Sequence, residues 1–237
     1  MAGALSFFNE HTDPLVRHGL NPHAPYTASL LLYKLAGECA AHNGMPLTTH
    51  VAESLEESLM FNEGRGALHD FLRDLGRPMH DCGHDTPFGW LWRNGAINNR
   101  WILAHMNDLR DTDMTLLESL PKERLPHIVH CPGSHRYFNH PPFAFSRLAR
   151  LGVNLCVGTD SLASTDSLSL LGELRKLQHT EPGLSPRELL HTVILAPARA
   201  LAMNGQLGCI APGAFADLIA LPGTCSVREA EAACVAH

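Results

Sequence analysis

The chain has 237 residues, of which 45% are hydrophobic and 18% are charged, so it can bury a sizeable core as one large domain or slightly more. The formal net charge of -6 gives no reason to expect a nucleic acid or an anionic membrane as partner. Seven cysteines without a Cys-x-x-Cys pair predict neither a disulfide framework nor a structural zinc knot, and they favour a reducing cytoplasm. The apolar start, Met1 to Phe8, lacks a basic leader, so we expect neither a signal peptide nor a membrane span.

Extended and helical segments alternate from the start of the chain. Leu15 to Pro22 is typical of a short strand, and the prolines around it exclude a helix there. Apolar residues at helical spacing predict a helix that starts at Ser29 and ends at Gly44. A strand follows from Leu47 and closes on His50. Ser54 to Glu57 is a capping box, which predicts that a second helix starts there.

A polar loop interrupts this alternation at residues 76–88, after a helical pattern that stops at Gly76. The loop is longer than a simple connector needs to be. Two interpretations stay open, a lid over a substrate and a solvated insertion. His80 and His84 have the spacing of a metal-binding pair on a helix, but Gly83 and the nearby prolines disfavour a helix at this point.

The alternation then resumes and continues as far as Met203. The predicted strands close on His105, on His130 and on Asp160, and each is an apolar run that ends in a polar residue. The predicted segments are a helix at 90–94, a strand at 101–105, a helix at 111–120, a strand at 127–130 followed by a turn, a helix at 145–151, a strand at 153–160, a helix at 169–179 and a helix from Ser185 with its own capping box.

Strands that alternate with helices predict a parallel sheet, because parallel neighbours need a crossover connection. Polar residues at the carboxyl ends of such strands gather at one face, as in a β/α barrel. Here those residues are His23, His50, His105 and Asp160. Five units fall short of the eight of a closed barrel, so we expect a partial barrel over residues 1–203. After Met203 the pattern predicts two short strands around Pro212 and Gly213, the remnant of an all-β element over residues 204–237.

His50 and Glu53 form the first candidate pair for chemistry. A strand that ends at His50 leaves the imidazole at the sheet's edge and Glu53 in the loop beyond it, where one could hold a metal ion while the other moves a proton. The alternative is a satisfied histidine beside a glutamate that starts a helix. The polar ends of the other strands favour the functional interpretation.

Several motifs together resemble the amidohydrolase superfamily. They are Pro22-His23-Ala24-Pro25-Tyr26, Thr49-His50-Val51-Ala52-Glu53, Ala104-His105, His130-Cys131-Pro132-Gly133-Ser134, Gly158-Thr159-Asp160-Ser161 and Pro212-Gly213-x3-Asp217-Leu218, in this order. Within that superfamily the chain is similar to the branch of adenosine, S-adenosylhomocysteine and aminodeoxyfutalosine deaminases and triazine chlorohydrolases. The resemblance extends from about Leu20 to Leu221 and implies about strands four to eight of the barrel, followed by the rear part of a small β-sandwich domain.

The resemblance also implies a role for each candidate residue. His50 and Asp160 would be metal ligands, and Glu53, His105 and Asp160 would be catalytic, with Glu53 as the proton shuttle. His23, Ser134 and His135 would lie on the substrate side. The implied cofactor is a divalent ion, zinc first and iron, nickel or manganese as alternatives. Zinc would lower the pKa of bound water to about 7.

One departure from the family's pattern limits this prediction. The family carries a His-x-His pair on its first barrel strand, and this sequence contains no such pair. We therefore expect weak or absent metal binding and an inactive fragment unless a complementing amino-terminal fragment or a second copy completes it. The expected reaction is deamination of a purine-like or other heterocyclic amine. Dechlorination of a triazine-like ring and a non-catalytic remnant or assembly module are the two alternatives.

Overall fold

A computed structural model describes residues 13, 16–220 and 226–236, so the expectation for Met1 to Phe8 lies outside the described residues. None of the described helices is long and apolar enough to cross a membrane. The strands are β1 (Leu47–Val51), β2 (Trp101–His105), β3 (His127–His130) and β4 (Asn154–Val157). The helices are α2 (Leu30–Asn43), α3 (Leu55–Glu63), α4 (Ala67–Asp74), α5 (Pro87–Arg93), α6 (Asp111–Ser119), the 3-10 helix η1 (Lys122–Arg124), α7 (Pro132–Tyr137), α8 (Phe145–Leu151), α9 (Leu170–Thr180), α10 (Pro186–His191), α11 (Leu195–Ala200) and α12 (Val227–Ala236).

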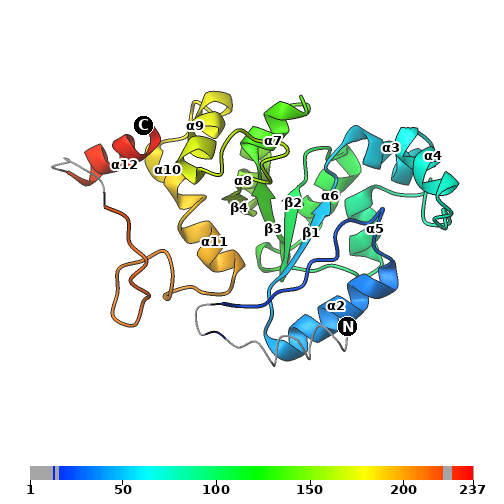
Figure 1. Cartoon of the computed structure of the whole chain (residues 1–237), viewed down its shortest axis with the longest axis horizontal. Helices are drawn as coiled ribbons and strands as arrows, with labels where there is room; N and C mark the ends of the chain where they lie inside the picture. The colour runs from blue at the N-terminus through cyan, green and yellow to red at the C-terminus, as the bar shows by residue number, and fades with distance from the viewer. Residues whose placement is uncertain (1–12, 14–15, 221–225, 237) are drawn as a thin grey trace.

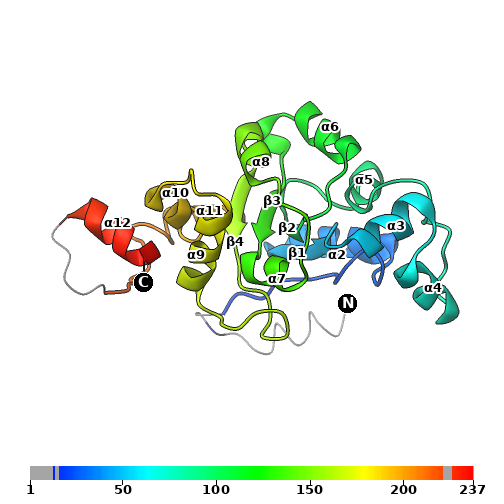
Figure 2. The ribbon, with the colours of Figure 1, turned by 90° about the horizontal axis from the view of Figure 1, so that it is seen from above.

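The four strands form one parallel sheet in the order β1-β2-β3-β4. Helices α3, α4 and α5 lie beyond β1, and α9, α10 and α11 lie beside β4 (Figure 1). Seen from above, α6 and α8 lie along one side of the sheet (Figure 2). The parallel α/β arrangement agrees with the predicted partial barrel, and all four carboxyl ends point the same way.

The predicted helix limits follow from their caps. The Ser29 hydroxyl accepts a hydrogen bond from Leu32 N at 3.2 Å, and Gly44 ends α2 in the left-handed region, with φ of 63°. Ser185 and Glu188 make both bonds of a capping box at α10. Helix α2 is fixed to β1 by the buried Tyr33, whose hydroxyl lies 2.6 Å from Thr49 Oγ1. These local signals therefore position helices against the sheet.

The first predicted strand, Leu15 to Pro22, is reduced to a single parallel bridge between Leu20 and Leu47 among the described residues. Leu20 O accepts a hydrogen bond from Thr48 N at 3.0 Å, and His23 O accepts one from His50 N at 2.8 Å. The segment therefore runs along β1, but its backbone bonds to β1 do not form the continuous ladder of a regular strand. The prediction of a fifth full strand is wrong for the described part of this segment.

The polar loop before α5 contains no helix, so His80 and His84 do not share a helical face. Arg77 anchors the loop. Its guanidinium donates to Tyr26 O at 2.8 Å and to Pro25 O at 3.1 Å, and it pairs with Asp81 at 2.8 Å. The loop is thus tied to the segment that carries His23. This contact leaves both earlier interpretations, lid and insertion, open as predictions.

The strands predicted around Pro212 and Gly213 do not form. Residues 208–220 contain no strand, and an isolated bridge joins Asn204 to Leu207. Ile210 is 91% exposed and Ile219 is 76% exposed. A strand needs a neighbour to pair its backbone groups, and the described residues supply none here.

The stretch after β3 also differs from its prediction, since Pro132 starts the short helix α7 instead of a turn.

Candidate active site

The carboxyl ends of β1 and β2 form the centre of the candidate site. Val51 pairs with His105 at the last rung of the ladder, and beyond it Met106 N donates to Val51 O at 3.1 Å. The backbone then turns sharply, with positive φ values of 51° at Ala52 and 71° at His105. Left-handed backbone is costly for residues other than glycine, and such residues concentrate at functional sites. We call this region, with the loops that follow β3 and β4, the mouth.

Three imidazoles gather at the mouth. The His50 ring lies 4.9 Å from the His23 ring and 5.4 Å from the His105 ring, measured between ring centroids. His50 Nδ1 lies 2.8 Å from His23 O, a contact that orients the ring and leaves Nε2 for another partner. His23 Nδ1 in turn lies 2.8 Å from the Thr27 hydroxyl. The predicted residues at positions 23, 50 and 105 are therefore neighbours in space.

Glu53 lies beside His105, with 3.6 Å between Oε1 and Nε2. Burial raises the pKa of the Glu53 carboxyl; the charge of Asp160 adds to this rise, and the imidazole of His50 opposes it. Burial, followed by the charge of His50, lowers the pKa of His105 to about 4. At neutral pH His105 is thus neutral, while Glu53 retains a proton more readily than an exposed glutamate. This pair is suited to proton transfer.

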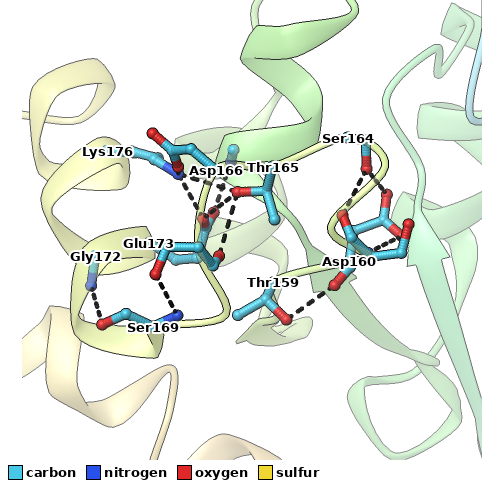
Figure 3. A network of polar contacts seen from close by, with 12 residues as sticks. Thr159, Asp160, Ser164, Thr165, Asp166, Ser169, Gly172, Glu173 and Lys176 are labelled. Carbon is cyan, nitrogen blue, oxygen red and sulfur yellow. Dashed lines mark hydrogen bonds and ion pairs between the residues drawn. The ribbon is translucent and has the colours of Figure 1, made fainter.

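Asp160 follows β4 with a positive φ of 60°. Its carboxylate accepts a hydrogen bond from the Ser164 hydroxyl at 2.8 Å (Figure 3). It also accepts hydrogen bonds from Ser161 N at 2.8 Å and from the Ser134 hydroxyl. Burial acts to raise the pKa of Asp160, but these hydrogen bonds and the charge of His105 outweigh burial and lower it. Asp160 therefore stays ionised in the electrostatic field of His105 and Glu53, as a base or a metal ligand must.

Ser134 is 1% exposed on α7, and a buried carboxylate that sequence reasoning missed holds this helix in place. Glu173 of α9 accepts a hydrogen bond from Gly133 N at 2.6 Å and pairs with Lys176 at 2.8 Å (Figure 3). Thr165, in the loop after Asp160, donates to the same carboxylate at 3.4 Å. Glu173 thus ties together the two loops that carry Ser134 and Asp160.

A second missed group holds the backbone of Glu53. The carboxylate of Glu57, which is fully buried, accepts a hydrogen bond from Glu53 N at 2.8 Å, and the Asn107 amide donates to Glu53 O at 3.1 Å. Ser54 still caps α3, but Glu57 reaches one residue further back than a capping box requires. The Ser54 to Glu57 pattern predicted a glutamate that binds a backbone N–H at the start of α3. It did not indicate that this N–H would belong to Glu53.

His135 lies at the border of the mouth. Its Nε2 lies 2.8 Å from Pro141 O, and its ring meets the ring of His130 edge to face at 5.1 Å. It lines a cavity next to α9 that none of His50, Glu53, His105 and Asp160 lines, but the charge of His105 still acts on it. The geometry therefore gathers His23, His50, Glu53, His105, Ser134 and Asp160, and His135 contacts the following loop beside them.

The described residues do not make a complete metal site. No group of three histidine, cysteine, aspartate or glutamate side chains among them could hold a metal ion. The predicted ligands, His50 and Asp160, are two, whereas a catalytic zinc takes three protein ligands and keeps an open position. An imidazole and a carboxylate have the right chemistry for such an ion, but the set is too small to bind one tightly.

Comparisons with known proteins identify relatives of this chain. The aminodeoxyfutalosine deaminase of Deinococcus radiodurans is 32% identical over 192 residues, which cover 76% of this chain and 44% of that protein. The chain spans about half the length of the curated relatives it matches.

Solved structures resemble the chain in fold. An adenosine deaminase from Xanthomonas campestris with bound zinc superposes with a TM-score of 0.72 at 28% identity, covering 91% of this chain and 46% of that one. The aminofutalosine deaminase of Helicobacter pylori gives a TM-score of 0.82 at 21% identity, covering 100% of this chain and 59% of that one. The sequence profile of the Amidohydrolase family matches residues 2–233. With that match and the polar ends of its parallel strands, the chain belongs to the amidohydrolase family.

Proposed function

We propose that this chain carries part of the active site of a metal-dependent hydrolase that cleaves a C–N bond on a heterocyclic amine, most simply by deamination of a purine-like ring. The observation that supports this most is the pairing of Glu53 with the neutral His105 at the mouth, 3.6 Å apart, with the ionised Asp160 in their field. The relatives named above are deaminases of nucleoside-like compounds, and this supports the same substrate class here.

The proposed reaction assigns one proton movement to each group. Water adds to the ring carbon that bears the amine, and ammonia leaves. Asp160 takes a proton from that water, because its lowered pKa keeps it ionised, and later returns a proton to the departing nitrogen. Glu53, whose raised pKa favours the protonated form, donates to the ring nitrogen, so that no anion forms on the ring. As ammonia leaves and the carbonyl forms, the remaining hydroxyl proton of the added water passes to Glu53 and restores its protonated form. His105 orients the attacking water through its neutral imidazole.

We propose further that His50 and Asp160 are this chain's contribution to a divalent-metal site, with zinc as the first candidate. The zinc of the Xanthomonas campestris relative supports the ion's identity. Because the described residues offer two ligands, other ligands must come from elsewhere, and a complementing polypeptide with a His-x-His strand would supply them. His23 and the buried Ser134 would contact the substrate.

The alternative is a non-catalytic assembly module that keeps the geometry of the site without using it. One observation favours it: no complete metal-binding group exists among the described residues. The two proposals differ in what happens when ligands are added from outside. A catalytic half-site gains activity, whereas an assembly module gains a partner without turnover.

The test uses the whole chain with and without a polypeptide that corresponds to the part of the Deinococcus radiodurans relative outside the match. Ammonia release from adenosine-type nucleosides, chloride release from a chlorotriazine and zinc content are measured. The chain alone should retain well under one zinc per chain after dialysis, and the mixture should bind zinc and release ammonia. Faster release of chloride than of ammonia would favour the dechlorination alternative.

The role of Glu53 is tested in the active mixture. Glu53→Gln should lower kcat by about 10²- to 10⁴-fold, because general acid catalysis contributes roughly that much. Glu56→Gln, at an exposed position three residues along, is the matched control and should leave kcat unchanged. Equal rates for both variants would remove Glu53 from the mechanism, and a mixture that forms a stable complex but never releases ammonia would favour the assembly module.

A further inference from the structure

A cavity of about 830 Å³ lies between α7, the loop that follows it, and α9. This volume is typical of sites for small molecules, which run from roughly 300 to 1,000 Å³. We propose that the cavity binds a small organic anion, a carboxylate or phosphate group attached to a flat apolar body. The cavity borders the mouth, since its lining residues His135 and His140 interact electrostatically with His105. The inference does not depend on the proposed deaminase function.

The charges around the cavity favour an anion. Arg136, Arg175 and Lys176 line it, and so do the carboxylates of Asp166 and Glu181. Lys176 is compensated, because it pairs with Asp166 at 3.0 Å and with the buried Glu173 at 2.8 Å (Figure 3). This leaves two guanidinium groups facing the single carboxylate of Glu181.

Neither Arg136 nor Arg175 makes an ion pair with any described residue, although the charge of Arg136 acts on Asp166. An anion in the cavity would accept hydrogen bonds from these guanidiniums, since guanidinium groups match carboxylate and phosphate oxygens in pairs.

The remaining walls of the cavity are apolar or carry neutral rings. Phe143 and Phe145 line it together with Leu177, and the Phe143 ring stacks on His130 at 4.0 Å with 11° between the planes. Burial, together with the charges of His135 and His105, lowers the pKa of His130 to about 3, so this ring is neutral at ordinary pH. Flat rings beside two guanidiniums suit a ligand that has a flat body and one anionic group.

Two lining imidazoles also have polar atoms without partners. His130 Nδ1 and His140 Nε2 are buried and have no hydrogen-bond partner among the described residues. Buried polar groups are nearly always paired, and an unpaired one in a native fold calls for a partner from outside. A bound ligand with its ordered water would supply such partners. This observation is independent of the charges described above.

A chain of polar contacts connects the cavity to Asp160 at the mouth. Lys176 lines the cavity and pairs with Glu173, and Glu173 holds Gly133 N next to Ser134, the residue that donates to Asp160. An anion that competes for Lys176 would weaken its pairing with Glu173. Occupancy of the cavity is therefore expected to alter the position of α7, in addition to any direct effect on Arg136 and Arg175.

Calorimetric titration of the whole chain tests the proposal, with benzoate and phenyl phosphate as ligands and acetate as the ligand without a ring. Benzoate should bind at least about tenfold more tightly than acetate, because its ring is buried in addition to its carboxylate. Arg136→Gln and Arg175→Gln should each weaken binding of benzoate by about tenfold, the expected loss for a charged hydrogen bond. Arg150→Gln, an arginine of α8 that does not line the cavity, is the control and should bind like the wild type.

Circular dichroism of every variant checks that the fold is intact. A second measurement on the unchanged protein covers the case of a variant that does not fold. Chloride added to the wild type should weaken benzoate binding, because it competes for the guanidiniums. Absence of benzoate binding to the wild type, equal affinity for benzoate and acetate, or equal affinity in the Arg150→Gln and Arg175→Gln variants would each overturn the proposal.

Discussion

The segments that end at the mouth and the C-terminal segment of residues 204–220 were both predicted to contain strands, yet strands form only at the mouth. At the mouth, each strand meets a neighbour, and the backbone of Glu53 is held on both sides by Glu57 and Asn107. In the C-terminal segment the described residues offer no neighbouring strand, and Ile210 and Ile219 remain exposed. An apolar run thus gives a strand only where the fold supplies hydrogen-bond partners.

Among substitutions that test the support of the mouth, the largest loss of stability is expected at Glu57. Glu57→Ala leaves the buried Glu53 N–H without its acceptor and creates a void, so the free energy of unfolding should fall by about 2–4 kcal/mol. Glu57→Gln keeps an oxygen of the same reach and should cost less than about 1 kcal/mol at pH 5. Urea unfolding followed by circular dichroism measures both. An alanine variant as stable as the glutamine variant would show that the mouth does not need this support.

The wild type and Glu57→Gln should also differ in how their free energy of unfolding depends on pH. Burial raises the pKa of Glu57 from an ordinary 4.5 to about 8, so the folded chain keeps a proton that the unfolded chain releases. The associated stability is complete below pH 4.5 and is lost as the pH rises toward 8. Between pH 5 and 8 the wild type should lose on the order of 3 kcal/mol relative to Glu57→Gln. Parallel pH profiles would contradict the buried, protonated carboxyl.

A smaller effect is expected at His130, at the end of β3. Its pKa is lowered to about 3 by burial, so the stability it contributes is present above pH 6.5 and is lost as the pH falls toward 3. His130→Gln should cost about 1–2 kcal/mol at pH 7 through the lost stacking on Phe143, yet it should lose about 3 kcal/mol less than the wild type between pH 6.5 and 4. His42→Gln, at an exposed position, is the control and should leave the free energy of unfolding at pH 7 unchanged.

The smallest effect is expected in the C-terminal segment. Ile210→Asp should change the free energy of unfolding by less than about 0.5 kcal/mol, because the side chain is 91% exposed. The same substitution at the fully buried Ile128 of β3 should cost more than about 4 kcal/mol. Denaturant unfolding of the two variants measures the contrast directly. A comparable loss at both positions would mean that the C-terminal segment packs in solution.

Much of the fold could be predicted because the deciding signals are local. Ser29, Gly44 and Ser185 set helix limits through bonds to their own segment, and the apolar runs before His50 and His105 can only be buried strands in a chain of this size. The convergence of the strand ends then follows from parallel topology. Strand ends are therefore the part of the site that a single sequence reveals.

What could not be predicted depends on contacts between distant segments. The bond from Gly133 N to Glu173 joins residues 40 positions apart, and nothing around Glu173 distinguishes it from a surface glutamate of an amphipathic helix. The position of His135 depends on Pro141 O, which the following loop happens to present. The loss of the first predicted strand depends on which backbone groups find a neighbour, and that is a property of the assembled sheet.

The left-handed backbone at Ala52, His105 and Asp160 has a consequence for laboratory evolution. Each of these residues costs roughly 1 kcal/mol of conformational energy that glycine would avoid. A screen that selects for heat tolerance alone would therefore favour glycine at positions 105 and 160. Those substitutions would remove the side chains of His105 and Asp160 that the proposed chemistry needs. Stabilising substitutions should therefore avoid positions 52, 105 and 160 and be sought on the exposed face of α2.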